Sequence, residues 1–547
     1  MGLNRIAIFC LLSLVAIFPA DAQSPESYSA LLTPRVKSGK LSPPAHVQDY
    51  VIDGKLHLRL QDAVRMALEN NTNIRIQETQ VEAQKFSLLG AYKLFDPLIQ
   101  SSANINRLSY SGYTQLQGVG DNNSAALNTL SQTVQASYTQ TFTTGTNIFA
   151  GVNSNRNSTN SDFYFLNPYV NSTVTLQFTQ PLLHNAGRFA NTAPIIIARR
   201  ALQQSRSSFE AQVNDAILQV VTQYWSVVQA RGSFDVEQRS LALAESSYQH
   251  DKRALELGAL PPLDIYRSQS EVAARRLQAI QSEYALKQAQ EAFRFTIGVD
   301  QDPTLAALEL DLVEKPEPEG EIEDVDPVAV LDKALTGRPE IAAANDAVAN
   351  DETSIRFAHN ALEPDLSLTG FYQSNGIGGN QYNLNTGQLI ATGGLGASYS
   401  QLFGFGFPGY GGTLTLNLPL RNRGAKANLG TALVARRRDL YASQITREQI
   451  VLQVKDAVHL LEEAKLTLAA GKTSLELARK SLAADQRKYE LGAETNFFVL
   501  DSQTKLAQSE LDLLQTQINY QIARATLDRA TGSLLEPYHV QIAELSH

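Results

Sequence analysis

Apolar residues recur every seven positions along two long stretches of the chain. Their members are Val220, Val227, Phe234, Leu241, Tyr248, Leu255, Val454, Leu461, Leu468, Leu475, Leu482 and Tyr489. A sustained seven-residue period predicts a helix with a coiled-coil-like apolar seam. We therefore expect long helices over 194–257 and about 425–491, each spanning about 90 to 100 Å at a rise of ~1.5 Å per residue.

One structural unit occurs twice in the chain. Both long stretches end in Glu-Leu-Gly-Ala, and Gly258 and Gly492 of these motifs are 234 positions apart (492 − 258 = 234). The same spacing continues without a gap to Gly298 and Gly532. Glycine supplies the backbone freedom that a sharp reversal needs, so Gly258 and Gly492 are predicted to lie at the tips of two helical hairpins.

A period of two replaces the helical period after Pro97 and after Pro364. A helix over 58–95 is expected before the first of these prolines. Beyond them, apolar residues alternate with Thr, Gln or Asn over Val174–Phe178 and over Leu414–Leu418. This alternation predicts strands with one apolar and one polar face. We expect one strand hairpin in each copy, and therefore about four strands per chain.

Two segments rich in Gly, Asn, Ser and Tyr, 111–167 and 373–412, are predicted to be long exposed loops. A local extra hairpin over 138–149 is an alternative for part of the first segment. The spacing between the copies drops to 238 between Pro181 and Pro419 (419 − 181 = 238), from 267 at the preceding proline pair (364 − 97 = 267). Most of the length difference between the copies therefore falls in these segments.

The beginning of the chain is typical of a secretory signal. Arg5 is followed by the apolar core Ile6–Phe18 and by the small-x-small site Ala20-Asp21-Ala22. The one cysteine, Cys10, lies within that core, which excludes a disulfide framework and a thiolate metal site in the mature protein. A net charge of −9 without a basic block argues against nucleic acid as a partner. No later stretch has the roughly 18 apolar residues of a membrane-spanning helix.

Motifs for catalysis, cofactors and metals fail on their context. Gly404–Gly409 matches a dinucleotide fingerprint by letter, but no helix is expected directly after it. Gly471-Lys472-Thr473 resembles part of a phosphate-binding loop, but Leu466 replaces its first glycine. The 8 histidines are scattered without metal spacing. We therefore expect no enzyme, no catalytic residues, no cofactor and no metal.

These boundaries divide the chain into six segments. They are a signal peptide (1–22), an N-terminal extended arm (23–55), a first structural repeat (56–310), an acidic proline-containing linker (311–327), a second structural repeat (328–533) and a C-terminal tail (534–547). Each repeat is expected to hold a helix, a strand hairpin and a long helical hairpin.

Neither the strands nor the long helices can be completed within one chain. Four strands leave two unpaired edges, and each unsatisfied backbone group costs several kcal/mol in lipid. An apolar seam about 90 Å long cannot be buried by one hairpin, whereas a ring of hairpins would cover every stripe. The sequence therefore predicts a mixed α and β membrane protein in which several chains share a β-barrel that continues into a long α-helical tunnel.

The order and duplication of these elements over residues 56–533 resemble those of the TolC-type outer-membrane factors of tripartite efflux pumps and type I secretion systems. The resemblance implies a homotrimer with four strands per chain in one shared barrel, located in the lipid of the cell outer membrane, and a tunnel that extends into the periplasm. It also implies two protein partners, a periplasmic adaptor (membrane fusion) protein and an inner-membrane pump of the RND, ABC or MFS type. The expected function is that of a passive exit duct.

The resemblance assigns docking of the adaptor to the hairpin tips. The residues expected to dock are Leu257, Gly258, Leu491 and Gly492. Exposed apolar residues at a hairpin tip suit a docking knob. Their alternative role is turn geometry, which is compatible with docking.

A tunnel gate is implied near the same tips. In the family, an acidic residue six positions after the first tip glycine pairs with a tyrosine three positions before the second, and these places hold Asp264 and Tyr489. Asp501 matches a position of the acidic ring at the tunnel entrance. Glu494 stands where the best-known members have a gate arginine, so an acid replaces one cation of their closed-state network.

A second class of protein fits part of the same pattern. A secreted trimeric coiled-coil structural or adhesive fibre with β-rich heads would also have long seams, and a sandwich head would also alternate apolar and polar residues. Extraction from outer membranes that depends on detergent would distinguish the channel from the fibre.

Overall fold

The computed structural model describes residues 46–111, 126–161, 163–257, 263, 265–300, 307–318, 325–491 and 493–538, which belong to one compact unit. The predicted signal peptide, Gly258, Gly492 and Asp264 lie outside the described residues. The fold therefore contains both long helical hairpins up to the residues that flank their tips.

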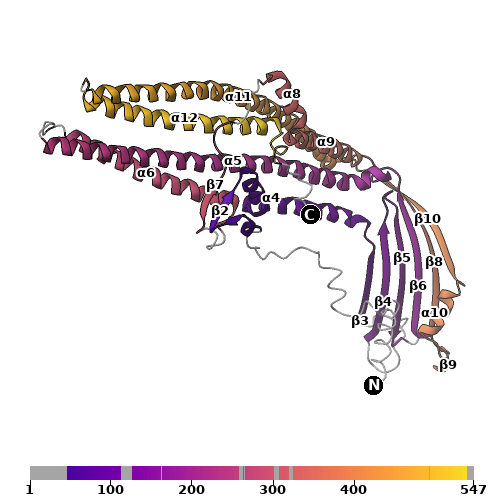
Figure 1. Ribbon diagram of the computed structural model, residues 1–547. Helices are drawn as coiled ribbons and strands as arrows, with labels where there is room; N and C mark the ends of the chain where they lie inside the picture. Colours follow the sequence, from indigo (N-terminus) through magenta and orange to yellow (C-terminus); the bar gives the residue numbers. More distant parts are fainter. Residues whose placement is uncertain are drawn as a thin grey trace. The chain divides into compact units, whose positions relative to one another are not determined.

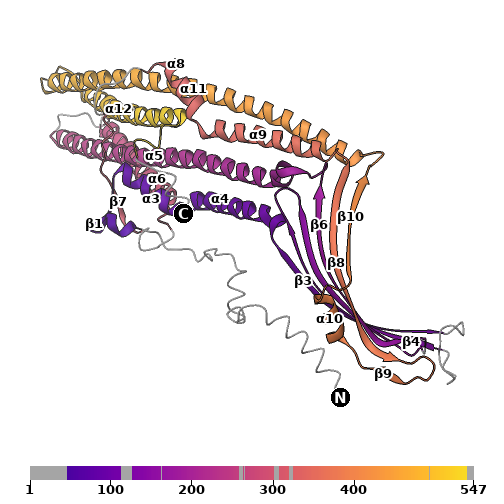
Figure 2. The same ribbon diagram turned by 90° about the vertical axis from the view of Figure 1, so that its right-hand side faces the viewer.

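Long helices run side by side in two antiparallel pairs, α5 with α6 and α11 with α12 (Figures 1 and 2). The helices are α3 (Leu60–Asn70), α4 (Thr72–Ala91), η3 (Tyr92–Phe95), α5 (Gly187–Glu256), α6 (Ile265–Ile297), α8 (Pro327–Gly337), α9 (Pro339–Asn360), α10 (Leu395–Phe403), α11 (Arg423–Glu490) and α12 (Asn496–Thr531). The two expected long helices are confirmed as α5, with 70 residues, and α11, with 68 residues. Both begin earlier than expected, so Pro194 lies inside α5 near its N-terminus.

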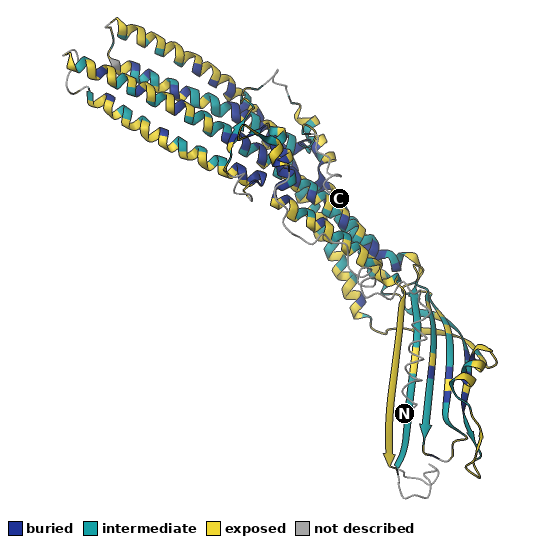
Figure 3. Cartoon of the chain, turned by 60° about the horizontal axis from the view of Figure 1, so that its bottom comes forward, coloured by how far each residue is buried: buried dark blue, intermediate teal, exposed yellow. Residues whose placement is uncertain are grey.

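The seven-residue seam is the contact surface of these helices. Val220 and Val227 of α5 and Val454 and Leu468 of α11 are buried, whereas Tyr489 near the end of the seam is half-buried. α12 also packs against α5, so the two copies contact each other directly. Figure 3 shows the buried positions concentrated in the middle of the helical part, while the free ends of the hairpins are exposed. The predicted coiled-coil-like seam is therefore confirmed.

The helix expected over 58–95 is divided at Asn71 into α3 and α4. The Asn71 side-chain oxygen accepts hydrogen bonds from the amides of Asn73 (2.8 Å) and Ile74 (3.3 Å), which caps the start of α4. The second copy has a corresponding break before Pro339, which begins α9. The short helix of each repeat is therefore a helix pair.

The strands of both copies join in one antiparallel sheet of seven strands. Their order is β10-β8-β6-β5-β4-β3, and β9 pairs with β8. The strands are β3 (Leu98–Ser111), β4 (Ala126–Thr141), β5 (Asn147–Thr159), β6 (Leu166–Pro181), β8 (Asp365–Tyr382), β9 (Leu389–Ala391) and β10 (Pro408–Asn417). Because β6 pairs with β8, the first copy meets the second within the sheet.

The expectation of about four strands per chain is wrong, because the large sheet of the described residues holds six long strands and the short β9. The predicted loop 111–167 contains β4 and β5, whose turn lies within the alternative hairpin over 138–149. These strands are rich in Ser, Thr, Asn and Gln, so apolar alternation marks them only weakly. The predicted loop 373–412 contains the end of β8, β9, α10 and the start of β10.

Cross-strand pairing sorts apolar and polar residues onto opposite faces of this sheet. Paired residues of antiparallel strands point to the same side, as Leu176 and Tyr372 do, and as Leu414 and Leu368 do. We call this side the apolar face; it includes Leu176, Phe178, Leu366, Leu368, Tyr372, Leu414 and Leu416. The opposite side is the polar face; it includes Thr173, Thr175, Gln177, Thr369, Thr413 and Thr415. The predicted two-faced strands are confirmed.

A second, smaller sheet contains the described end of the predicted arm. It consists of β1 (Val51–Ile52), β2 (Lys55–Leu58) and β7 (Glu309–Leu312), in the order β1-β2-β7, and follows η2 (Val47–Tyr50). β2 and β7 pair in parallel and contribute buried leucines to the same core as α3, α5 and α6. The small sheet therefore belongs to the helical part of the protein.

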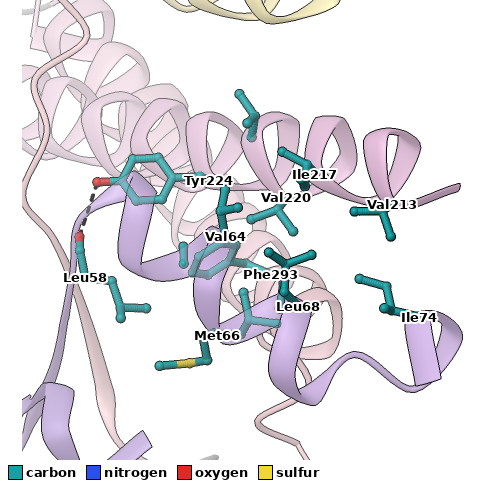
Figure 4. Close-up of a cluster of buried hydrophobic side chains, with 14 of the residues drawn as sticks. Leu58, Val64, Met66, Leu68, Ile74, Val213, Ile217, Val220, Tyr224 and Phe293 are labelled. Atoms are coloured by element: carbon teal, nitrogen blue, oxygen red, sulfur yellow. Dashed lines mark hydrogen bonds between the residues drawn. The ribbon is translucent and has the colours of Figure 1, made fainter. Parts of the chain in front are cut away.

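Tyr224 of α5 joins this small sheet to the helices. Its ring packs edge-on against Phe293 of α6, with 5.9 Å between the ring centroids. Its hydroxyl donates to the Leu58 carbonyl at 3.3 Å (Figure 4) and accepts from the Glu314 amide at 3.2 Å. Burial raises the pKa of Tyr224, so the hydroxyl keeps its proton at neutral pH.

We expect Tyr224→Phe to lower the free energy of unfolding by about 1 to 3 kcal/mol, because the part-buried Glu314 amide loses the hydroxyl as its acceptor and the Leu58 carbonyl keeps only the Val313 amide, at 3.3 Å. Thermal unfolding followed by circular dichroism would measure the change. Tyr284→Phe removes the same hydroxyl from an exposed position of α6 and should change stability by less than about 0.5 kcal/mol. Equal effects of the two substitutions would contradict the role of Tyr224.

Candidate functional site

The free ends of the two helical hairpins form the candidate site. α5 ends at Glu256 and α6 begins at Ile265, while α11 ends at Glu490 and α12 begins at Asn496. The amide of Leu257 donates to the Arg253 carbonyl, which closes the last turn of α5, and Leu491 does the same in α11. The short connections leave both leucine side chains outside the helix packing.

A serine and an aspartate clasp each hairpin just below its tip. The Ser268 hydroxyl of α6 donates to the Asp251 carboxylate of α5. The Ser502 hydroxyl of α12 donates to the Asp485 carboxylate of α11 at 2.5 Å. Both pairs are related by the spacing of the repeat (485 − 251 = 502 − 268 = 234). We call these two hydrogen bonds the Asp–Ser clasps, and they join the outgoing helix to the returning helix at the same place in both copies.

Charge strengthens the clasp of the second hairpin. The Ser502 hydroxyl, followed by Lys488, lowers the pKa of Asp485 below its usual value. A carboxyl whose pKa is lowered by folding stabilises the fold above its unfolded pKa, and this contribution is lost as pH falls through the lowered value. The second clasp is therefore intact at neutral pH and weakens only in strong acid.

Glu494, at the position where the resemblance implies a gate arginine, forms its ion pair within its own hairpin. Its carboxylate lies 2.7 Å from the Lys488 ammonium, which also lies 3.3 Å from Asp485. These two acids raise the pKa of Lys488, with Glu494 as the larger cause. The acid that replaces the arginine is therefore compensated by a lysine of α11.

Tyr489 connects the ends of the two copies. Its ring lies edge-on to His250 of α5, with 6.4 Å between the ring centroids. Burial, followed by the negative charge of Asp251, raises the pKa of Tyr489, so its phenol is neutral at physiological pH. The structure does not test its expected pairing with Asp264, which lies outside the described residues.

The third gate candidate, Asp501, is held by its own helix. Its carboxylate lies 2.6 Å from the Lys505 ammonium, one turn further along α12. Asp501 raises the pKa of Lys505, so the ammonium stays charged at neutral pH. Part of the negative field expected from Asp501 at the tunnel entrance is therefore neutralised locally.

Exposed apolar side chains gather around the hairpin ends. We call them the tip surface, which comprises Leu257, Leu263, Tyr266, Leu491, Phe497 and Phe498. Leu257 is 84% exposed and Leu491 is 68% exposed. The Arg267 guanidinium lies 5.0 Å from the centre of the Phe497 ring, which links α6 to α12. Sequence reasoning named the two leucines but missed the aromatic residues, although these follow the tip motifs closely.

Metal ligands and phosphate-binding motifs are the other chemical features to place within the described residues. Among them, no group of three or more His, Cys, Asp and Glu residues could hold a metal ion. Gly404–Gly409 runs from the end of α10 into β10, and Gly471 is buried within α11, so neither motif forms a phosphate cradle. No helix of the described part has the length and apolarity needed to cross a membrane.

A twice-repeated unit of short helices, strands and one long helical hairpin defines the fold of a TolC-like channel. The chain belongs to the outer membrane efflux protein family, whose sequence model matches residues 145–299 and 330–533. The matched ranges include most of both repeats. The family is one of outer-membrane channels rather than enzymes, and membership confirms both the expected family and the expected location in the outer membrane.

Individual relatives agree with this assignment. The toluene efflux pump outer membrane protein TtgC of Pseudomonas putida is 22% identical over 345 residues, which cover 61% of this chain and 65% of the relative. The chain thus aligns with slightly less than two thirds of the length of this relative. The Campylobacter jejuni CmeC outer membrane channel has a TM-score of 0.60 at 15% identity, covering 93% of this chain and 94% of CmeC. A membrane protein from Pseudomonas aeruginosa has a TM-score of 0.61 at 19% identity, covering 90% and 99%.

We expect Ser268→Ala to loosen the first hairpin without unfolding the protein, because it removes the donor of one Asp–Ser clasp. Amide hydrogen exchange over the last turns of α5 should become roughly two- to tenfold faster, the effect of one hydrogen bond. Ser282→Ala is the matched control, since this hydroxyl bonds only to the Ala279 carbonyl of its own helix. Unchanged exchange near the tip would show that the clasp does not hold the hairpin.

Proposed function

We propose that this protein is the outer-membrane exit duct of a tripartite efflux pump or a type I secretion system. It conducts substrates passively from a periplasmic adaptor and an inner-membrane pump of the RND, ABC or MFS type to the exterior. The observation that carries this proposal is the direct continuity of a two-faced sheet with very long helices. β6 ends at Pro181 and α5 begins at Gly187, and β10 ends at Asn417 and α11 begins at Arg423.

The edges of the sheet support assembly into a homotrimer. β3 is exposed along its whole length and β10 along nearly all of it. Unpaired backbone groups at both edges would be costly in lipid, so the edge strands of neighbouring copies must pair. Three copies with six long strands each would close a barrel of eighteen strands rather than twelve. With strands ~4.8 Å apart and tilted by ~40°, such a barrel is about 36 Å across, compared with about 24 Å for twelve strands.

The apolar face would then meet lipid and the polar face would line the lumen. Exposed polar residues of the long helices, such as Gln238, Gln249, Lys472 and Gln486, would line the tunnel in the periplasm. The repeats 56–310 and 328–533, joined by the linker 311–327, would each supply one hairpin of the tunnel wall. Because β7 pairs with β2, the first repeat would extend beyond its expected end at residue 310, through Leu312.

The hairpin ends would carry both the docking and the gating of the duct. The tip surface, expected to dock together with Gly258 and Gly492, presents exposed leucine and aromatic side chains, which suits insertion into an adaptor. Asp264, Tyr489 and Asp501 would hold the tunnel entrance closed, with Tyr489 kept in place by its contact with His250. The secreted fibre is not favoured, because the chain belongs to a family of outer-membrane efflux proteins.

Cross-linking of the edge strands tests the trimer. We expect the double variant Ser102→Cys with Thr413→Cys to give covalent dimers and trimers with a short bis-maleimide, because both positions lie mid-strand on the polar face. The sole natural cysteine, Cys10, lies in the predicted signal peptide and does not interfere. Thr175→Cys with Gln373→Cys, partners within one chain, should give monomers only. Monomers alone from the edge pair, or covalent tetramers, would contradict the trimer.

Conductance tests the duct and its gate. In planar lipid bilayers the wild-type protein should pass ions, and Asp264→Ala combined with Tyr489→Phe should raise the single-channel conductance several-fold by releasing the entrance. Tyr284→Phe, on the exposed middle of α6, should leave the conductance unchanged. An unchanged conductance of the double variant would remove the gate assignment, whereas a wild-type protein without any conductance would refute the duct.

A further inference from the structure

The helix α10 packs on the part of the sheet that lies away from the long helices. The proposed function as an exit duct gives no role to this helix. It lies between β9 and β10 and packs against β8 and β6. The Ser398 hydroxyl of α10 donates to the Gly376 carbonyl at 2.7 Å, and the Ser374 hydroxyl donates to the Leu402 carbonyl at 2.7 Å. All three side chains of Ser374, Ser398 and Leu402 are fully buried. The helix is therefore fixed to the sheet by specific contacts.

Small residues of β8 and β6 allow this close approach. A Cβ added to Gly376 would lie 2.0 Å from the Ser398 carbonyl oxygen, and one added to Gly378 would lie 2.2 Å from the Gly394 carbonyl oxygen. Ser172, the partner of Gly376 in β6, is fully buried. Larger side chains at these places would exclude the helix, so the sheet is shaped to receive it.

α10 lies on the apolar face of the sheet. Ser374, Gly376 and Gly378 follow Leu368 and Tyr372 at even spacing along β8, so all five residues point to the same side. The ring of Phe405, just after α10, lies 6.4 Å from the ring of Tyr372. If the apolar face meets lipid, as proposed above, α10 lies outside the barrel rather than in its lumen.

The outer surface of this insertion is aromatic and carries no charge. Phe403, Phe405 and Phe407 are 62%, 54% and 60% exposed, and Tyr410 is 80% exposed. The sequence has no Asp, Glu, Lys or Arg between Asp365 and Arg421. Exposed aromatic residues without charges are unfavourable in water, but they suit the boundary between acyl chains and headgroups.

The height of α10 on the sheet matches the far boundary of the membrane. Leu366 lies near the helices and Gly376 lies under α10, ten residues further along β8. Ten residues of a strand span about 33 Å. Because barrel strands are tilted by ~40° to the barrel axis, this length corresponds to a height of about 25 Å. The apolar band of outer-membrane barrels is about 25 Å tall and is flanked by aromatic girdles.

We propose that α10 and the aromatic residues that follow it form a lipid-binding collar on the outside of the barrel. This inference rests on the proposed function, which supplies the membrane orientation of the sheet. The collar consists of α10 with Phe403, Phe405, Phe407 and Tyr410, and its partner is the lipid of the outer leaflet at the headgroup boundary. It anchors the barrel on the second repeat, beside the edge strand β10.

Tryptophan quenching by brominated phospholipids tests the collar in reconstituted vesicles. Phe403→Trp should be quenched, and more strongly by bromine near the headgroup than by bromine near the chain end. Ile377→Trp is the matched control, because Ile377 lies at the same height of β8 on the polar face and should escape quenching. Trp225, the one natural tryptophan, is buried among the helices and gives a constant background.

A third variant, Leu416→Trp on the apolar face of β10, distinguishes a failure of the collar from a failure of the proposed membrane orientation of the sheet. If Leu416→Trp is quenched and Phe403→Trp is not, the collar is wrong while the membrane orientation of the sheet stands. An unquenched, blue-shifted Phe403→Trp would show that protein covers this surface, for example β3 of the next copy. If Leu416→Trp also escapes quenching, the proposed orientation of the sheet is itself wrong.

Discussion

The two edge strands of the large sheet need hydrogen-bond partners, and the arrangement of the rest of the structure depends on this need. Within the described residues, β3 and β10 each pair on one side only, so two rows of backbone donors and acceptors face outward. In water such edges invite aggregation, and in lipid each unpaired group costs several kcal/mol. The proposed closure by identical copies would satisfy both rows at once, because the β3 edge of each copy would pair with the β10 edge of its neighbour. Closing the sheet in this way would also bring the attached long helices together in a ring.

The long helices and the repeat were predictable because their signal is long-range and redundant. Each copy has six apolar residues at a seven-residue period, which predicts a long helix. The same pattern recurs in the second copy at a spacing of 234 residues, so the prediction does not depend on one stretch alone. β4 and β5 were missed because their apolar positions are sparse: Ser, Thr, Asn and Gln occupy both faces over much of their length. Such strands are stabilised by pairing with β3 and β6, and pairing between distant residues leaves little trace in a local pattern.

In the candidate site, too, some residues could be predicted from the sequence and others could not. Leu257 and Leu491 could be named from the tip motif alone, and the structure places both on the exposed hairpin ends. The Asp–Ser clasps could not be predicted in this way, because nothing in the sequence around a helical aspartate indicates a hydrogen-bond partner 17 residues away. Only the repeat offered a signal, since both the aspartate and the serine recur at the same spacing. The recurrence of an aspartate and a serine at the same places in both copies could therefore have indicated a contact between them.

The two copies contribute equally to the helical hairpins but unequally to the sheet, and topology explains why this is tolerated. A tunnel wall needs matched helices, because each apolar stripe must face another stripe of similar length. An antiparallel sheet can instead accept an added hairpin, since β4 and β5 together leave the direction of β6 unchanged. The chain still leaves β6 at Pro181 towards α5, as it leaves β10 towards α11. Strand pairs can thus widen the membrane part while the number of long helices stays fixed, and the short connections after β6 and β10 must absorb the difference in diameter.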